Sequence, residues 1–154
     1  SYMKRNSKLS LALHVLGHMA QTPDQPRTSE DLARLHDTNP VVVRRVLGPL
    51  RAAGILLAEK GHHGGWRLAH PAAVITLEAI YAALDEPFLS PGRFAPDPAH
   101  PCAIEAAMAE TVNAAMIEAE AVIRRHFAQK TLADIATAYG AAAFSAFPQG
   151  DSPL

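Results

Sequence analysis

Three segments with helical periodicity, followed directly by a glycine-rich hairpin, occupy the first seventy residues and most constrain how this chain can fold. In segment 8–20, apolar residues recur at three- and four-residue steps. Thr28 or Ser29 is the N-cap candidate for a second, shorter helix, and Asn39-Pro40 supplies a third helix with a cap and a proline at its first position. Gly54 ends that helix. We therefore expect three helices before residue 55.

The hairpin follows at once. Residues 55–58 and 66–69 predict two short strands, joined by a turn that contains Gly61, Gly64 and Gly65. Three helices and then a hairpin is the element order of a winged helix-turn-helix, in which the third helix enters the major groove of DNA and the hairpin, or wing, lies against the phosphate backbone. We expect Trp66 to anchor the wing on the core.

The second half of the chain has a different pattern. Residues 86–101 contain five prolines, too many for regular structure, and residues 102–127 then predict one long helix without Gly or Pro. Its apolar residues step by four and three, which is typical of a coiled-coil seam. We expect a dimer interface on that seam at Ile104, Met108, Val112, Ala115, Met116, Ala119, Val122 and Ile123. Glu120 and Arg124 should form an exposed ion pair.

These patterns divide the 154 residues into four segments and predict a mainly α fold. They are a winged helix-turn-helix unit at 4–85, the proline-rich loop at 86–101, a dimerisation helix with a short last helix at 102–140, and a frayed tail at 141–154. Charge follows a similar division, because residues 1–70 hold ten Lys and Arg against five Asp and Glu, and the remainder is acidic. A basic unit joined to an acidic one indicates a module that meets a polyanion.

The composition excludes several other classes of protein. The chain is too short for a two-domain enzyme, and no segment reaches the roughly 18 apolar residues of a membrane span. His14, Gly17 and His18 interrupt the apolar run near the start, which argues against a signal peptide. Cys102 is the single cysteine, so an intrachain disulfide is excluded and a reducing compartment is favoured. We expect a cytoplasmic protein.

Arginines on the third helix are the strongest candidates for DNA contact. Arg44 and Arg45 lie away from the helix's apolar stripe, and Asn39 carries the donor and acceptor that adenine requires. The residues expected to contact DNA are Arg5, Ser7, Ser29, Thr38, Asn39, Val41, Val42, Arg44, Arg45, Arg51, Lys60, His62, His63, Gly64 and Gly65. Adjacent arginines are also common on solvated helix faces, so a winged-helix protein-interaction module without specific DNA binding is the alternative.

The sequence resembles the Rrf2 family of winged-helix bacterial transcription regulators. The likeness is carried by residues 39–45, by residues 50–55, by the wing sequence 60–69 and by Ile75-Thr76-Leu77, and it extends from Lys4 to about Gly140. It implies a homodimer, paired through the long helix, that binds a palindromic operator on double-stranded DNA. It also implies a transcriptional regulator, acting as a repressor, and no catalysis.

The resemblance also raises the question of a cofactor. Sensing members of this family hold an iron–sulfur cluster with three cysteines before the long helix, but Cys102 stands alone here. We expect no cluster and no other metal, since adjacent His62 and His63 are poor chelators without further ligands. Cys102 is either a redox switch at a helix N-terminus or a structural cysteine packed under the loop. A thiol enzyme using Cys102 and His100 has no evident group to orient the histidine.

Overall fold

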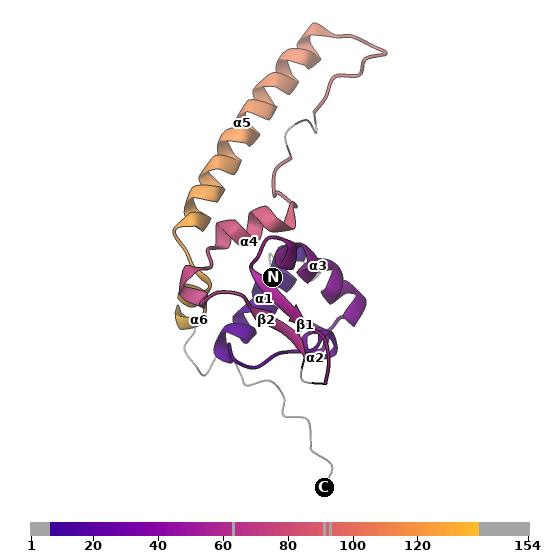
Figure 1. The fold of residues 1–154 in the computed structure, drawn as a ribbon. Helices are drawn as coiled ribbons and strands as arrows, with labels where there is room; N and C mark the ends of the chain where they lie inside the picture. Colours follow the sequence, from indigo (N-terminus) through magenta and orange to yellow (C-terminus); the bar gives the residue numbers. More distant parts are fainter. Residues whose placement is uncertain (1–6, 63, 91, 93, 139–154) are drawn as a thin grey trace.

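The computed structural model describes residues 7–62, 64–90, 92 and 94–138 (Figure 1). Arg5, His63 and the tail at 141–154, which carry sequence-based predictions, lie outside the described residues. In chain order the elements are α1 (Lys8–Gln21), α2 (Ser29–Leu35), α3 (Pro40–Ala52), β1 (Leu56–Glu59), β2 (Gly65–Leu68), a 3₁₀ turn η1 (Ala72–Val74), α4 (Leu77–Leu84), α5 (Ala103–Ala128) and α6 (Leu132–Ala138). The predicted class, a mainly helical fold with a wing and a long C-terminal helix, is confirmed.

Local capping chemistry fixes where four of the helices begin. Ser7 caps α1, Thr28 caps α2 and Thr76 caps α4, each by accepting a hydrogen bond from the backbone N–H three residues on. Asn39 caps α3 in the same way, and Pro40 occupies its first turn. A side-chain cap contributes about 1 kcal/mol. These starts are therefore encoded within a few residues of sequence.

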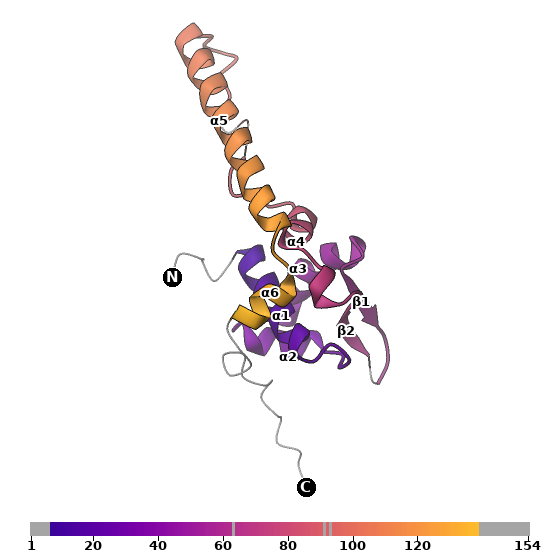
Figure 2. The same ribbon diagram turned by 90° about the vertical axis from the view of Figure 1, so that its left-hand side faces the viewer.

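The core forms where α1, α3 and α4 meet, and α6 closes it from the side (Figures 1 and 2). Leu16, Leu47 and Ile80 are fully buried there. α6 returns from the end of α5 to pack on α1, and its Leu132 is fully buried in the same cluster. The Leu132 N–H donates to the Ile75 carbonyl at 2.8 Å. Residues from beyond the long helix thus complete the winged-helix core.

Trp66 holds the wing against the helices. β1 and β2 are antiparallel, with Glu59 opposite Gly65. On its other side, Trp66 exchanges two backbone hydrogen bonds with Arg27, at 3.0 Å and 2.8 Å, so the segment before α2 adds a one-residue bridge to the sheet. The buried indole donates its N–H to the Ser29 hydroxyl at 3.0 Å. The prediction that Trp66 anchors the wing is confirmed.

α5 projects from the globular body, and the described residues between α4 and α5 lead outward alongside it to its first turn (Figures 1 and 2). The Gly92 N–H donates to the Asn113 side chain of α5 at 3.0 Å. Of the 26 residues of α5, Ala109 and Glu120 are the buried ones. Within the described residues, none of the helices has the length and apolarity that crossing a membrane requires.

The predicted exposed ion pair between Glu120 and Arg124 is wrong. Glu120 is buried and accepts hydrogen bonds from the Tyr81 hydroxyl of α4. Arg124 lies instead beside Glu78, with 3.8 Å between its Nη1 and the carboxylate. Helical spacing places two side chains on adjacent turns, but it does not reveal which neighbouring element covers them.

Three histidines gather between α1 and the end of α2. His14 Nδ1 lies 2.9 Å from His36 Nδ1, and the rings of His14 and His18 are 5.0 Å apart. Burial lowers the pKa of His14, and the nearby His18 and His36 lower it further. Burial, with a contribution from Arg27, also lowers the pKa of His18. The folded state therefore favours the neutral form of both rings.

This cluster predicts loss of stability in mild acid. Because the folded chain resists protonation of His14 and His18 while the unfolded chain binds protons near the ordinary pKa of 6.5, the free energy of unfolding should fall as the pH drops from about 7.5 to 5.5. Urea unfolding followed by circular dichroism measures this slope. The double variant His14→Gln, His18→Gln should flatten it, whereas His100→Gln, at an exposed histidine, should not. Equal slopes in all three proteins would contradict the assignment.

Candidate nucleic-acid interface

The exposed side of α3 carries its charge. Val43, Val46 and Leu47 face the core, whereas Arg44 and Arg45 are exposed, as predicted. Because an arginine fork matches the two acceptors of guanine in the major groove, this side of the helix has the chemistry of a base-reading surface.

The N-terminal end of α3 is also available. Val41 is 57 % exposed and can pack on a thymine methyl group. The Asn39 side chain is exposed, but its oxygen accepts the Val42 N–H at 3.1 Å. That capping bond engages the acceptor needed to read adenine. The structure therefore shows Asn39 as the cap of α3.

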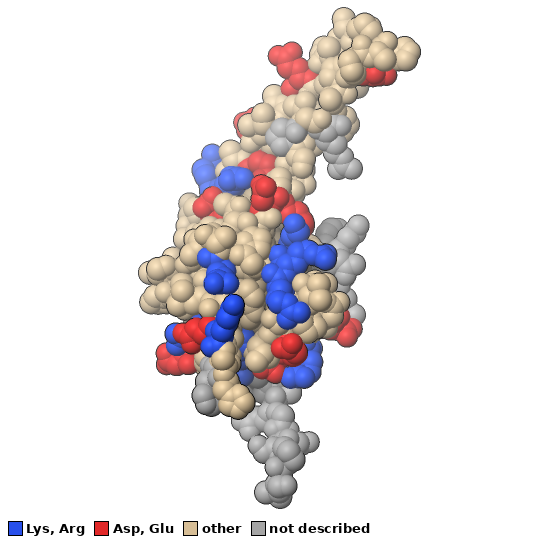
Figure 3. All heavy atoms as spheres, turned by 45° about the vertical axis from the view of Figure 1, so that its right-hand side comes forward, with Lys and Arg blue, Asp and Glu red and all other residues tan. Residues whose placement is uncertain are grey.

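Cations gather on the globular body and avoid the projecting end of α5. On the face shown in Figure 3, Lys and Arg side chains lie over the body, whereas the far end of α5 shows acidic and uncharged residues. The exposed cations of the winged-helix unit within the described residues are Arg34, Arg44, Arg45, Arg51 and Lys60. Arg34 is engaged by Asp31. A positive surface on the unit that presents α3 and the wing suits a phosphate backbone.

The wing glycines make room for the protein's own backbone. A Cβ on Gly64 would lie 2.2 Å from the Glu59 carbonyl oxygen, and one on Gly65 would lie 2.6 Å from that of Arg27. Gly65 also has φ +147°, which side chains rarely permit. The packing of the wing on its own backbone thus requires glycine at both positions, and their predicted contact with DNA stays a prediction. Lys60 remains exposed at the wing.

Other predicted contact residues lie elsewhere. Ser29 is buried beneath Trp66, and its hydroxyl is not on the surface of α3 and the wing. The hydroxyl of Ser7 caps α1. Thr38 is half-buried and lines a hollow of about 530 Å³ between α1 and α3, where Lys8 and Arg45 also lie. The exposed Arg51 and His62 do belong to the surface of the winged-helix unit.

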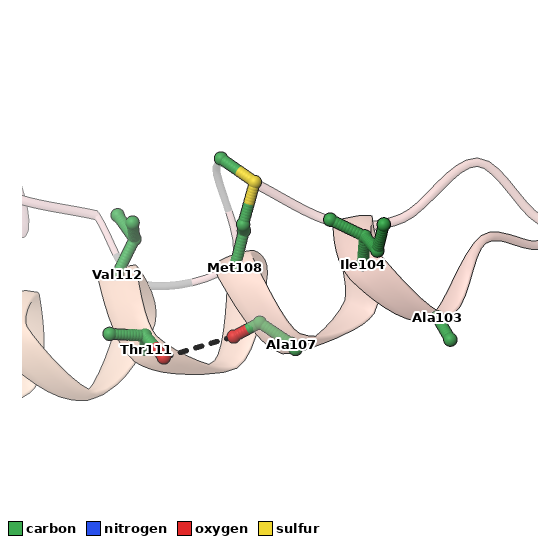
Figure 4. A pocket seen from close by; sticks show the side chains of 6 residues that line it. All are labelled: Ala103, Ile104, Ala107, Met108, Thr111 and Val112. Atoms are coloured by element: carbon green, nitrogen blue, oxygen red, sulfur yellow. Dashed lines mark hydrogen bonds between the residues drawn. The ribbon is translucent and has the colours of Figure 1, made fainter.

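The first half of α5 exposes an apolar face. Ile104 and Met108 are 72 % and 62 % exposed, and with Val112 they project to the same side of the helix (Figure 4). A hollow of about 500 Å³ lies along these turns. Val122 continues the exposed stripe, whereas Ile123 packs on the chain's own core. Ile117 is exposed too, but at about 100° per residue it lies on the side opposite Met108, outside the stepping pattern.

Cys102 is exposed at the N-cap of α5, so its interpretation as a cysteine packed under the loop is wrong. Its side chain makes no capping hydrogen bond. His100, two residues earlier, has Nδ1 3.0 Å from an Asp97 oxygen, an orienting partner that the sequence did not reveal. That hydrogen bond lowers the pKa of Asp97. No three His, Cys, Asp or Glu side chains among the described residues are placed to hold a metal ion.

A three-helix unit with exposed arginines on α3, an anchored wing and a projecting helix defines the winged helix-turn-helix class of DNA-binding regulators. The comparison with known proteins then specifies the family. Residues 5–138 match the Rrf2 family, described as iron-dependent transcriptional regulators, and the chain belongs to this family.

The relatives are regulators of transcription as well. YwnA of Bacillus subtilis strain 168, named as an HTH-type transcriptional regulator, is 31 % identical over 132 residues, which cover 84 % of this chain and 95 % of YwnA. A crystal structure of a transcriptional regulator from Lactobacillus plantarum has a TM-score of 0.70 at 29 % identity, covering 83 % of this chain and 86 % of its own. CymR of Bacillus subtilis, with 21 % identity, a TM-score of 0.61 and coverage of 88 % and 98 %, shows the same fold. These proteins are transcriptional regulators, not enzymes.

Proposed function

We propose that this chain is a homodimeric, sequence-specific repressor that binds a palindromic operator in the bacterial cytoplasm. The observation that carries the proposal is the pair of exposed arginines, Arg44 and Arg45, on the side of α3 that faces away from the core. In a two-fold dimer the two α3 helices would enter successive major grooves about 34–36 Å apart, with the wings on the adjacent phosphates. A dimer in that position blocks access of polymerase to the promoter.

The exposed stripe on α5 supports the homodimer. Ile104, Met108 and Val112 project to one side of α5 (Figure 4), in the half of the helix that extends beyond the globular body (Figures 1 and 2). Burying a large apolar side chain stabilises a complex by about 1.5–3 kcal/mol. A stripe stepping by four and three residues is complementary to a second copy of itself, because knobs of one helix fit the holes of the other. The second copy is the occupant that we assign to this face.

Two variants should distinguish contacts that read bases from contacts that bind the phosphate backbone. Arg44→Ala should remove about 1–3 kcal/mol of discrimination between operator and random duplex, since the arginine fork would contact a base edge. Lys60→Ala should weaken binding to both duplexes and lower the salt slope of binding by about one, since it would contact phosphate. Selection from random duplex DNA identifies the operator, and fluorescence anisotropy at several salt concentrations measures both effects.

Matched controls give this experiment its meaning. Arg34→Ala removes an exposed cation that Asp31 already engages, and it should change neither quantity. If Arg44→Ala and Lys60→Ala cause equal losses on operator and random duplex, the assignment of α3 as the reading helix fails. If the wild-type protein has no salt-dependent affinity for any duplex, the chain is instead a protein-interaction module.

An iron–sulfur cluster does not fit the residues of this chain, despite the family's description as iron-dependent. A cluster is normally held by four protein ligands, usually thiolates, and the sequence contains one cysteine. We therefore propose that the regulator works without a cluster. Cys102 is exposed at the start of α5, so its oxidation is the redox signal that this chain could register.

A further inference from the structure

Glu120 is the one carboxylate that is buried among the described residues. It lies on α5 at the level of α4, where the projecting helix meets the globular body. Removing a carboxylate from water costs several kcal/mol unless hydrogen bonds replace the lost hydration. The partners of Glu120 therefore determine what this carboxylate does.

Those partners come from the two segments that face α5. The Tyr81 hydroxyl, on α4, lies 2.9 Å and 2.8 Å from the two carboxylate oxygens, which share its single proton. The Leu89 N–H, from the segment that leaves α4, donates to the same carboxylate at 2.9 Å. The Phe88 N–H donates to the Tyr81 oxygen at 2.8 Å. One carboxylate thus joins α4, the following segment and α5.

Nearby groups reinforce this arrangement. Burial raises the pKa of Tyr81, the bond from the Phe88 N–H lowers it, and the bond to Glu120 raises it, so the hydroxyl keeps the proton that it donates. The Arg124 guanidinium lies 5.7 Å from the centre of the Tyr81 ring, and the Phe127 ring packs edge-on against Tyr81 at 5.4 Å. Hydrogen bonds have directional requirements that apolar packing lacks. The network therefore fixes the angle of α5 as well as its contact with α4.

We propose that Tyr81 and Glu120 form a joint that sets the spacing between the two operator half-sites. This inference rests on the proposed function, in which α5 pairs two chains and each globular body carries one α3. The angle between α5 and the body then determines how far apart the two α3 helices lie. Tyr81 and Glu120 are positioning residues in this scheme, and neither contacts DNA.

The geometry makes small changes of angle consequential. A unit of about 75 residues has a radius of gyration near 11 Å, so its far side lies about 25 Å from a joint at its edge. A rotation of about 10° there would move that side by about 4 Å, close to the 3.4 Å rise of one base pair. The two-fold axis applies the same rotation to both bodies. A loosened joint would therefore let the dimer accept operators of several spacings.

The test compares affinities for operators with altered spacers. Duplexes carrying the selected half-sites at the native spacing, and at spacings changed by −1, +1 and +2 base pairs, are bound to wild-type protein, Tyr81→Phe and Glu120→Gln. The affinity of the wild type should fall at least about tenfold for each base pair added to or removed from the spacer. Each such change requires the joint to rotate away from its preferred angle. Both variants should lose less than about threefold, with an unchanged base preference inside each half-site.

Two controls separate the joint from general stability. Glu118→Gln alters an exposed carboxylate on the same helix and should keep the wild-type spacing preference. Leu16→Ala lowers the melting temperature from the buried core without touching the joint, and it should keep that preference too. Wild-type spacing preference in both Tyr81→Phe and Glu120→Gln would overturn the inference while leaving the proposed function intact. A wild-type protein that gains nothing from a second half-site would overturn both.

Discussion

Met108→Glu is expected to convert the protein to a monomer and to lower its affinity for the two-half-site operator by about 100-fold, because binding of the second half-site loses the effective concentration that linkage provides. Met108 is 62 % exposed on the apolar stripe of α5. In a dimer, two copies of the substituted carboxylate would be buried close together without partners, which costs several kcal/mol. Sedimentation velocity measures the assembly, and anisotropy measures the affinity.

Ala114→Glu is the matched control for this variant. It introduces the same side chain at an exposed position of α5 that lies about 120° around the helix from Met108. It should remain dimeric and bind the operator as the wild type does. Affinity of Met108→Glu for a single half-site should also be unchanged, since the globular body is untouched. If Met108→Glu stays dimeric, the stripe is not the dimer interface.

Trp66→Ala is expected to produce the largest loss of stability, about 3–5 kcal/mol, because it removes a large buried side chain and leaves a cavity under the wing. The Ser29 hydroxyl would lose its partner as well. For a chain of this length the loss corresponds to a decrease in melting temperature of about 10 °C. Thermal unfolding followed by circular dichroism measures it.

Two smaller changes divide this effect into its parts. Trp66→Phe keeps most of the apolar volume and removes the indole N–H, and Ser29→Ala removes the acceptor, so each should cost about 1–3 kcal/mol. Leu57→Ala, at an exposed position of β1, should cost little. If Trp66→Ala were no more destabilising than Leu57→Ala, Trp66 would not be the anchor of the wing.

Local signals explain why so much of the fold can be predicted from the sequence. Asn39-Pro40 begins α3 through a capping bond and a proline at the first position, both of which depend on neighbouring residues alone. The apolar stripe of α3 places Val43 and Val46 inside, and Arg44 and Arg45 then follow on the exposed side. Periodicity suffices to identify the buried face of α3, because this helix packs on a single core.

Contacts between distant segments explain what the sequence could not predict. The opposite charges of Glu120 and its helical neighbour Arg124 predict an exposed pair, and nothing local indicates that Tyr81 lies across from Glu120. Arg27 lies in a loop by composition, yet its backbone extends the wing. Leu132 completes the core from a helix of seven residues, too short for a pattern to reveal its packing.

The backbone bridge between Arg27 and Trp66 also limits which parts of the chain can change length. Insertions or deletions between α1 and α2 would displace Arg27, which clamps the wing. They should therefore destabilise the fold even though that loop is exposed. The clamp lies at the tip end of β2, because Trp66 directly follows Gly65, whose partner Glu59 borders the turn. Residues added within the turn would precede Trp66 and leave its bridge to Arg27 in place. A longer wing for new DNA targets should therefore be made by extending the hairpin tip while preserving the bridge between Arg27 and Trp66.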